Sequence, residues 1–212
     1  MFIKKAMTSK VISIDIETEI IKAHEIMTKN NIRHLPVLDK DNKVIGMVTD
    51  RDIRSAMPFN LSKKEKQNIK FKAKDIMTEN PYTISSLATI QDALLLIQKN
   101  KIGGLPVVDE NNKLKGIVSV RDLLSSFINV LGIGEPGTLL GLVLEEKIGQ
   151  LKKIVDVITE FKISMGSVLV ARYQEENKRV VFIYLLTNNV IPLKKKLKVM
   201  GYTLIDPISW YI

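Results

Sequence analysis

The chain contains no cysteine among its 212 residues, and aromatic residues make up only 6% of it. Without cysteine there are no disulfides, no thiolate metal site and no cysteine nucleophile. No apolar run approaches the ~20 residues needed to span a bilayer, and the N-terminal residues 1–10 lack the apolar core of a secretory signal. These absences predict a cytoplasmic globular protein that has no membrane segment.

Acidic residues are also scarce relative to basic ones, and the formal net charge is +9. Such an excess favours anionic partners. Lysine-rich stretches at 63–74 and 194–198 contribute to it, and such runs are typical of solvated faces. Because there is little aromatic interleaving and no helix-turn-helix or zinc-finger spacing, nucleic acid is the less favoured partner and is kept as an alternative.

The chain repeats itself without a gap at an offset of 70 positions. Met7 aligns with Met77, and the tripeptide Leu-Pro-Val at 35–37 aligns with the same tripeptide at 105–107. Further matched pairs are Ala23 and Ala93, Gly46 and Gly116, Arg51 and Arg121, and Asp52 and Asp122. So many matches at one offset predict two copies of one folding unit.

Hydrophobic periodicity predicts the same α/β pattern in both copies. The first copy is expected to have strands at 11–16, 35–38 and 44–49, a helix that opens at Thr18, and a second helix at 50–57. The second copy is expected to have strands at 82–85, 105–108 and 114–119 and helices at 89–99 and 121–131. Between them, a capping-box pattern at 62–65 predicts a short helix, and this stretch is either a solvated linker or a lid over a ligand.

Each copy resembles a CBS domain, and the tandem resembles a CBS pair, also called a Bateman module. The resemblance rests on Met-Thr before the first strand, on Leu-Pro-Val, and on the hairpin sequences Gly-Met-Val-Thr-Asp-Arg-Asp at 46–52 and Gly-Ile-Val-Ser-Val-Arg-Asp at 116–122. It implies CBS domains at 1–60 and 75–131, with a linker at 61–74.

The chemistry of the hairpin motif suits a nucleotide. The hydroxyl of Thr49 or Ser119 can bond a phosphate or ribose oxygen, and an ionised Asp52 or Asp122 can accept from both ribose hydroxyls. The following helix begins there, and its free N–H groups favour phosphate. The alternative is that these four side chains only cap their helices.

By resemblance, the pair has two clefts, each built from the Asp motif of one copy and the start of the other. The first would combine Arg33, His34, Met47, Thr49, Arg51 and Asp52 with Pro81 and Tyr82. The second would combine Gly104, Ile117, Ser119, Arg121 and Asp122 with Thr8, Val11 and Ile12. Since Arg33-His34 corresponds to Gly103-Gly104, we expect the first cleft to be more cationic, the second to be roomier, and their affinities to differ.

The register of the repeat ends near Asn129, and a glycine-rich linker at 132–137 follows. The patterns at 138–212 predict the order βαββαβ, the ferredoxin-like plan, with Pro192 at a helix start. This part resembles an ACT domain, although Ile148 stands where that family usually has proline. The resemblance implies either dimerisation alone or an effector site at Ile148, Gly149, Gln150 and Leu151. The combination is similar to acetoin-utilisation-type CBS–ACT proteins.

The resemblances imply a regulatory sensor of AMP, ADP, ATP or a related adenosyl ligand, as in energy sensing, with or without Mg²⁺ and with no covalent cofactor. A homodimer through the CBS and ACT faces is expected, and an unidentified protein partner beyond it. Catalysis is not expected, because no nucleophile–base pair, P-loop or metal-ligand spacing is present, so no catalytic or metal-binding residue is predicted. A nucleic-acid-binding regulator and a purely structural dimeric scaffold are the alternatives.

Overall fold

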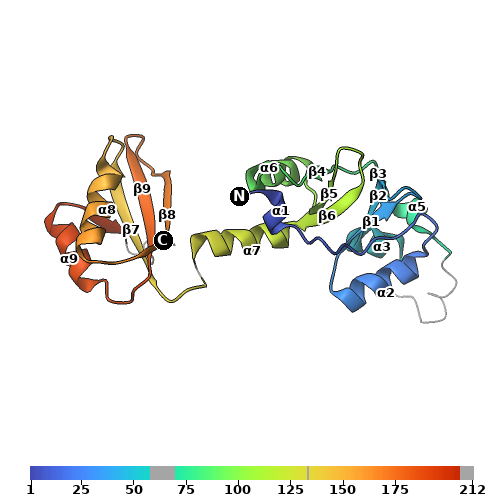
Figure 1. Ribbon diagram of the computed structural model, residues 1–212, viewed down its shortest axis with the longest axis horizontal. Coiled ribbons are helices and arrows are strands. Elements are labelled where there is room, and N and C mark those ends of the chain that lie inside the picture. The colour runs from blue at the N-terminus through green and yellow to red at the C-terminus, as the bar shows by residue number, and fades with distance from the viewer. Residues whose placement is uncertain (58–69, 133, 206–212) are drawn as a thin grey trace. The chain divides into compact units, whose positions relative to one another are not determined.

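The computed structural model describes residues 1–57, 70–132 and 134–205 (Figure 1). It divides into two compact units, Met1–Leu124 and Ser125–Ile212. The short helix predicted at 62–65, with its role as linker or lid, lies outside the described residues.

The first unit contains the two copies, and each copy has an antiparallel strand pair. The first copy has α2 (Ile20–Asn30), β1 (His34–Leu38), β2 (Val44–Thr49) and α3 (Asp50–Ala56). The second has α6 (Ile90–Asn100), β5 (Gly104–Val108), β6 (Leu114–Ser119) and α7 (Val120–Leu131). Leu35 lies opposite Val48 in one pair, as Leu105 lies opposite Val118 in the other. The sequence repeat is therefore a structural repeat with one register.

Each copy is completed by a segment that precedes the other copy. Helix α1 (Ile3–Ala6) delivers Ile3 to the hydrophobic core of the second copy, and Ile3 N donates to Ala88 O at 2.8 Å. Helix α5 (Ala73–Ile76) delivers Ala73 to the core of the first copy, and strand β3 (Thr78–Glu79) pairs with β2. Because neither core is complete without the exchanged segment, the two copies form one folding unit.

Two predictions about the start of the first copy are wrong. The predicted strand 11–16 is reduced to one parallel bridge between Ile14 and Val37. The strand stops there because Asp15 Oδ1 accepts from Glu17 N at 2.8 Å, which turns the chain away from β1. Helix α2 consequently begins at Ile20 rather than Thr18. In the second copy, strand β4 (Ile84–Ser85) is also short and runs parallel to β5.

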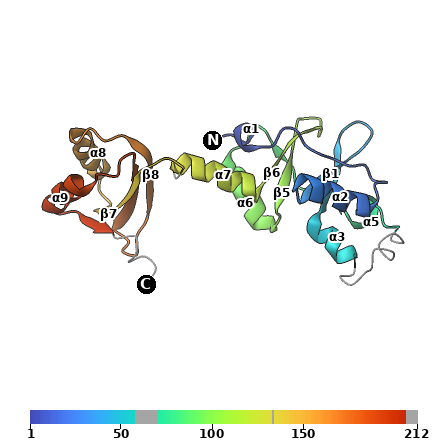
Figure 2. The same cartoon turned by 90° about the horizontal axis from the view of Figure 1, so that it is seen from below.

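The second unit has the predicted element order βαββαβ. Its elements are β7 (Thr138–Glu145), α8 (Gln150–Glu160), β8 (Met165–Arg172), β9 (Lys178–Leu185), α9 (Ile191–Val199) and β10 (Thr203–Ile205). The strands form one antiparallel sheet in the order β10-β7-β9-β8. Both helices cover the same face of this sheet (Figure 2), and Pro192 lies in the first turn of α9 as predicted.

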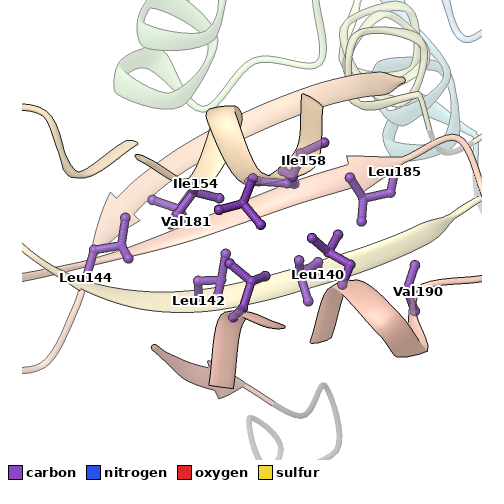
Figure 3. Packing of buried hydrophobic residues seen from close by; sticks show 12 residues of the cluster. Leu140, Leu142, Leu144, Ile154, Ile158, Val181, Leu185 and Val190 are labelled. Atoms are coloured by element: carbon purple, nitrogen blue, oxygen red, sulfur yellow. The ribbon is translucent and has the colours of Figure 1, made fainter. Parts of the chain in front are cut away.

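The core of the second unit lies between this sheet and its two helices. Alternate residues of β7 and β9 point to the helices, as the two-residue period of a strand requires. Figure 3 shows Leu140 and Leu142 of β7 facing Ile154 and Ile158 of α8, and all four are buried. The opposite sheet face has no helix from this unit among residues 134–205.

Candidate functional site

The predicted Ser119–Asp122 motif lies where β6 ends and α7 begins. Ser119 N and Ser119 Oγ both donate to Asp122 Oδ2, at 2.7 and 2.6 Å, and Asp122 N lies 3.3 Å from Ser119 Oγ. This is the reciprocal arrangement of a capping box, and it fixes both side chains at the start of a 12-residue helix. These bonds use Oδ2, and Oδ1 takes part in none of them.

The first copy has the same arrangement. Thr49 N and Thr49 Oγ1 donate to Asp52 Oδ2 at 2.8 and 2.7 Å, and the pair caps α3. The caps that the sequence offers as an alternative function therefore exist in both copies. Capping occupies only one oxygen of each aspartate, so it does not compete with an acceptor role for the other oxygen.

A cavity of about 590 Å³ lies in front of the Ser119–Asp122 motif. It is lined by Thr8, Lys10, Val11, Ile12, Asn31, Ile32, Arg33, His34, Gly103, Ile117, Ser119, Val120, Arg121, Asp122 and Leu124. The segment before the first copy reaches it through a two-way bridge, in which Thr8 N donates to Ile117 O at 2.9 Å and Ile117 N donates to Thr8 O at 3.0 Å. Seven of the eight residues predicted for the second cleft thus lie together.

The lining of this cavity differs in part from the residues predicted for it. Arg33 and His34, which the sequence analysis grouped with Asp52, line the cavity at Asp122. Gly104 is buried and Gly103 lines the cavity instead, because the imidazole of His34 covers the glycine pair: a Cβ on Gly104 would lie 3.5 Å from His34 Cδ2. Lys10, Arg33 and Arg121 all line this cavity, so the cleft at Asp122 is itself cationic.

Other lining residues were missed by the sequence analysis: Lys10, Asn31, Ile32, Gly103, Val120 and Leu124. Lys10 lies between predicted residues Thr8 and Val11, so its inclusion could have been inferred from contiguity. Asn31 ends α2 in the left-handed conformation, with φ of 51°. No sequence pattern indicates on its own that this helix end reaches the other copy's motif.

The residues predicted around Asp52 occupy related positions. Strand β3 places Thr78 opposite Met47, which brings the segment before the second copy beside the first copy's motif. Met47 is buried, Asp52 is half-buried, and Arg51 is exposed. Pro81 is half-buried and Tyr82 is exposed, and both follow β3 within three residues.

The aspartates of both motifs, Asp52 and Asp122, act on His34 through their charges. Burial lowers the pKa of His34 below its usual value, and the neighbouring charge of Arg33 lowers it further, whereas Asp52 and Asp122 act in the opposite direction. The lowered pKa favours the neutral imidazole at pH 7, which can donate one hydrogen bond and accept another. Among the described residues, no group of three histidine, aspartate or glutamate side chains could hold a metal ion.

The candidate effector residues of the second unit form the turn between β7 and α8. Gly149 is the N-cap of α8 with φ of 86°, a conformation that favours glycine, and a Cβ there would have no neighbour within 4 Å. Ile148 is fully exposed, and Leu151 is 37% exposed. Glycine is thus required here by backbone conformation rather than by close packing.

None of the helices within residues 1–57, 70–132 and 134–205 is both long and apolar enough to cross a membrane.

Comparison with known proteins agrees with the tandem architecture. A family model of the CBS domain matches residues 3–58 and 73–129. A CBS domain-containing protein of Dictyostelium discoideum is 35% identical over 137 residues, which cover 62% of this chain and 94% of that protein. The inosine-5'-monophosphate dehydrogenase of Aquifex aeolicus is 32% identical over 126 residues, but the match covers 58% of this chain and only 24% of the enzyme.

Solved structures give the same result. The CBS domain pair of protein MJ0100, in complex with 5'-methylthioadenosine and S-adenosyl-L-methionine, matches with a TM-score of 0.53 and 28% identity, over 60% of this chain and 95% of that one. AcuB of Vibrio cholerae matches with a TM-score of 0.53 and 26% identity, over 64% and 98%. CBSX2 in complex with AMP matches with a TM-score of 0.52 and 25% identity, over 60% and 96%. The chain therefore belongs to the CBS-domain family and carries two CBS domains in tandem.

Proposed function

We propose that the chain is a regulatory protein whose CBS pair binds an adenine nucleotide or related adenosyl ligand. The observation that carries this proposal is the cavity of about 590 Å³, which combines apolar walls with the Ser119–Asp122 motif and three cations. Its volume falls in the range of about 300–1,000 Å³ that is typical of small-molecule sites. Two structurally similar CBS proteins were solved with AMP or with S-adenosylmethionine and 5'-methylthioadenosine.

The lining residues divide into three chemical roles. Val11, Ile12 and Ile117 supply apolar surface for the adenine ring. Asp122 Oδ1, which takes no part in the cap, accepts hydrogen bonds from the ribose hydroxyls. The N-terminal N–H groups of α7 and the side chain of Arg121 attract phosphate. In the related cleft, Met47, Asp52 and Tyr82 take the corresponding roles.

The exchanged segments provide the route from binding to regulation. A ligand in the cavity contacts residues 8–12, which precede the first copy, and the motif of the second copy at 117–122. It therefore stabilises one placement of these segments. A ligand shifts such an equilibrium only by its difference in affinity between the two states, so ligands with different contacts produce different outputs.

We propose that the second unit holds two copies of the chain together as a dimer. Its elements are consistent with an ACT-like domain at 138–212, joined by a linker at 132–137 to CBS domains at 1–60 and 75–131. Edge strand β8 supports dimerisation, because Val168, Leu169 and Val170 are 41–51% exposed and uncharged. A second effector would bind at Ile148–Leu151. An unidentified protein partner would bind the resulting dimer, and we propose that the chain is of the acetoin-utilisation type.

The test is thermal unfolding and calorimetric titration of the full chain with AMP, ADP, ATP, S-adenosylmethionine, GTP and amino acids, with and without Mg²⁺. A ligand that binds only the folded state raises the unfolding midpoint. We expect an adenine compound to do so, and Asp122→Asn to weaken its binding. Asp92→Asn is the matched control, because Asp92 forms the same capping box with Thr89 at the start of α6.

The outcomes separate the alternatives. Loss of binding in Asp122→Asn but not in Asp92→Asn supports the site, whereas equal effects would mean that the caps alone matter. A midpoint shift with an amino acid but with no nucleotide would move the function to the second unit. Tight, salt-dependent binding of duplex without nucleotide binding would favour the nucleic-acid alternative. No response to any of these probes would favour the scaffold.

A further inference from the structure

Helix α9 of the second unit differs in charge from α8, the other helix that covers the same face of the sheet (Figure 2). The charged residues of α8 are two lysines and two acidic residues, all exposed, and Lys152 Nζ bonds Asp156 Oδ2 at 2.6 Å. Helix α9 contains four lysines and no acidic residue. Charges of both signs are typical of a solvent-exposed helix face, so α8 fits that description and α9 does not.

The positive charge of α9 is not neutralised by the rest of the chain that the structure describes. The four lysines are Lys194, Lys195, Lys196 and Lys198. None of them takes part in an ion pair with a residue of 1–57, 70–132 or 134–205. Lys194 is half-buried and the other three are exposed. The helix therefore presents all four cations to an anionic partner.

The apolar residues of α9 lie on two opposite sides of the helix. Leu193 and Leu197 are fully buried in the core of the unit. Ile191 and Val199 are 65% and 86% exposed, because two residues along an α-helix rotate the side-chain direction by about 200°. Residues four apart share one face, so Ile191, Lys195 and Val199 form a single outer row. This row has a branched apolar side chain at each end and a lysine between them.

An anionic bilayer surface matches this row in both charge and polarity. Single exposed apolar residues are common on proteins, but here they occupy both ends of the outermost row of a helix rich in lysine. Anionic headgroups attract lysine, and aliphatic side chains enter the boundary between headgroups and acyl chains. The long stem of a lysine lies along apolar surface while its ammonium stays at the level of the headgroups.

Other occupants fit α9 less well. Nucleic acid is typically bound through arginine forks, polar side chains that contact base edges, and stacked aromatic rings. Within Ile191–Val199 there is no arginine, no aromatic residue and no uncharged polar residue. A second copy of the chain would bring the same four lysines against this face, and such a like-charge contact is unfavourable.

We infer that α9 attaches the chain to anionic membrane surfaces, with its four lysines at the lipid phosphates and with Ile191 and Val199 inserted shallowly among the headgroups. The attachment is peripheral and reversible, because a lysine near such a surface contributes only roughly fivefold to the affinity. It goes beyond the proposed function and does not depend on it, since α9 belongs to the second unit and the nucleotide cavity is lined by residues 8–124.

The experiment is co-sedimentation of the full chain with vesicles of phosphatidylcholine alone and with vesicles of equal parts phosphatidylcholine and phosphatidylglycerol. We expect binding to the mixed vesicles only, and weaker binding as the salt concentration rises. Lys195→Glu should reduce the affinity roughly tenfold or more, because it replaces an attraction by a repulsion. Lys29→Glu is the matched control: it makes the same change in net charge at an exposed position of α2, and its effect should be much smaller.

A second pair of variants tests the apolar contact without changing charge. Val199→Ser, at a side chain too exposed to support the fold, should reduce the affinity for mixed vesicles roughly threefold or more. Leu95→Ser on α6, where Leu95 is 66% exposed, should leave it unchanged.

The opposing outcomes are equally specific. No binding of the wild type to mixed vesicles, equal losses in Lys195→Glu and Lys29→Glu, or an unaltered affinity of Val199→Ser would overturn the inference. Binding of duplex DNA that Lys195→Glu weakens, without vesicle binding, would assign the helix to nucleic acid instead. Titration of the same variants with adenine nucleotides tests the proposed function separately, so either proposal can fail while the other stands.

Discussion

The imidazole of His34 lies against the backbone of Gly103, so that a Cβ atom on Gly103 would fall 2.6 Å from His34 Nε2. The repeat places Arg33 and His34 opposite Gly103 and Gly104. At this point the two copies meet so closely that one side carries large side chains and the other carries none. The difference between residues 33–34 and 103–104 is thus tied to packing, because a side chain on Gly103 would meet the His34 ring.

This contact predicts a non-additive pair of substitutions. Gly103→Ala should destabilise the chain by about 0.5–1.5 kcal/mol, because the His34 ring must turn away from the added Cβ and leave its preferred rotamer. His34→Ala removes the obstructing ring, so in that background Gly103→Ala should cost much less. Denaturant unfolding of the wild type, both single variants and the double variant measures the coupling. Strictly additive losses would contradict the contact.

Helices α2 and α6 are equivalent in the repeat but differ in their N-terminal caps, and this difference gives a second prediction. At the start of α6, Thr89 Oγ1 donates to Asp92 Oδ2 at 2.7 Å and accepts from Asp92 N at 3.2 Å. Helix α2 has Glu19 at the equivalent position and no side-chain cap. Thr89→Ala should therefore lower the free energy of unfolding by about 1 kcal/mol, and Glu19→Ala should have almost no effect. Urea unfolding of both variants compares them, and similar losses would argue against the cap.

A third prediction concerns pH. Glu17 bonds Lys72 Nζ at 2.5 Å and Lys74 Nζ at 2.6 Å, and the bond from Lys72, followed by that from Lys74, lowers the pKa of Glu17 from 4.5 to about 2. A carboxylate whose pKa is lowered by folding adds stability above its unfolded pKa. That contribution is lost as the pH falls from about 4.5 to about 2.

Glu17→Gln should therefore lower the unfolding midpoint slightly at pH 7 and reduce the loss of stability between pH 4.5 and 2. Because all three side chains are solvent-exposed, salt should shrink the difference. Thermal scans across this range test it. Glu25→Gln is the control, since Glu25 is exposed on α2 and forms no ion pair within the described residues. Parallel pH curves for wild type and Glu17→Gln would exclude the stabilising role.

The repeat and the strand periodicity determined most of the fold in advance. The Leu-Pro-Val tripeptides at 35–37 and 105–107 are buried along their whole length, and such short apolar runs could be predicted as strands from the sequence. The extent of the strand expected at 11–16 could not be predicted in this way, because its β-branched residues indicate an extended backbone but not which strand it pairs with. Only one residue, Ile14, meets β1 before Asp15 turns the chain.

The candidate site was predictable only in part, for a related reason. The repeat identifies equivalent residues, and so it assigned Asp52 and Asp122 to separate clefts. It cannot show toward which cleft a side chain near the boundary of the copies points. Arg33 and His34 lie beside the Asp52 motif, because His34 pairs with Thr49 and Asp50 N donates to Arg33 O, but they also line the cavity at Asp122.

The last prediction tests the assigned dimer. Strand β8 is at the edge of its sheet, and its backbone can pair with that of a second copy. Leu169, in its middle, is 47% exposed. Burying an unpaired carboxylate at an interface costs several kcal/mol, so Leu169→Glu should raise the dimer dissociation constant by at least about tenfold in analytical ultracentrifugation. The same change at Val199, which is 86% exposed on α9, should leave association unaffected. A wild-type chain that is monomeric at every concentration, or equal dissociation of both variants, would remove β8 as the dimer edge.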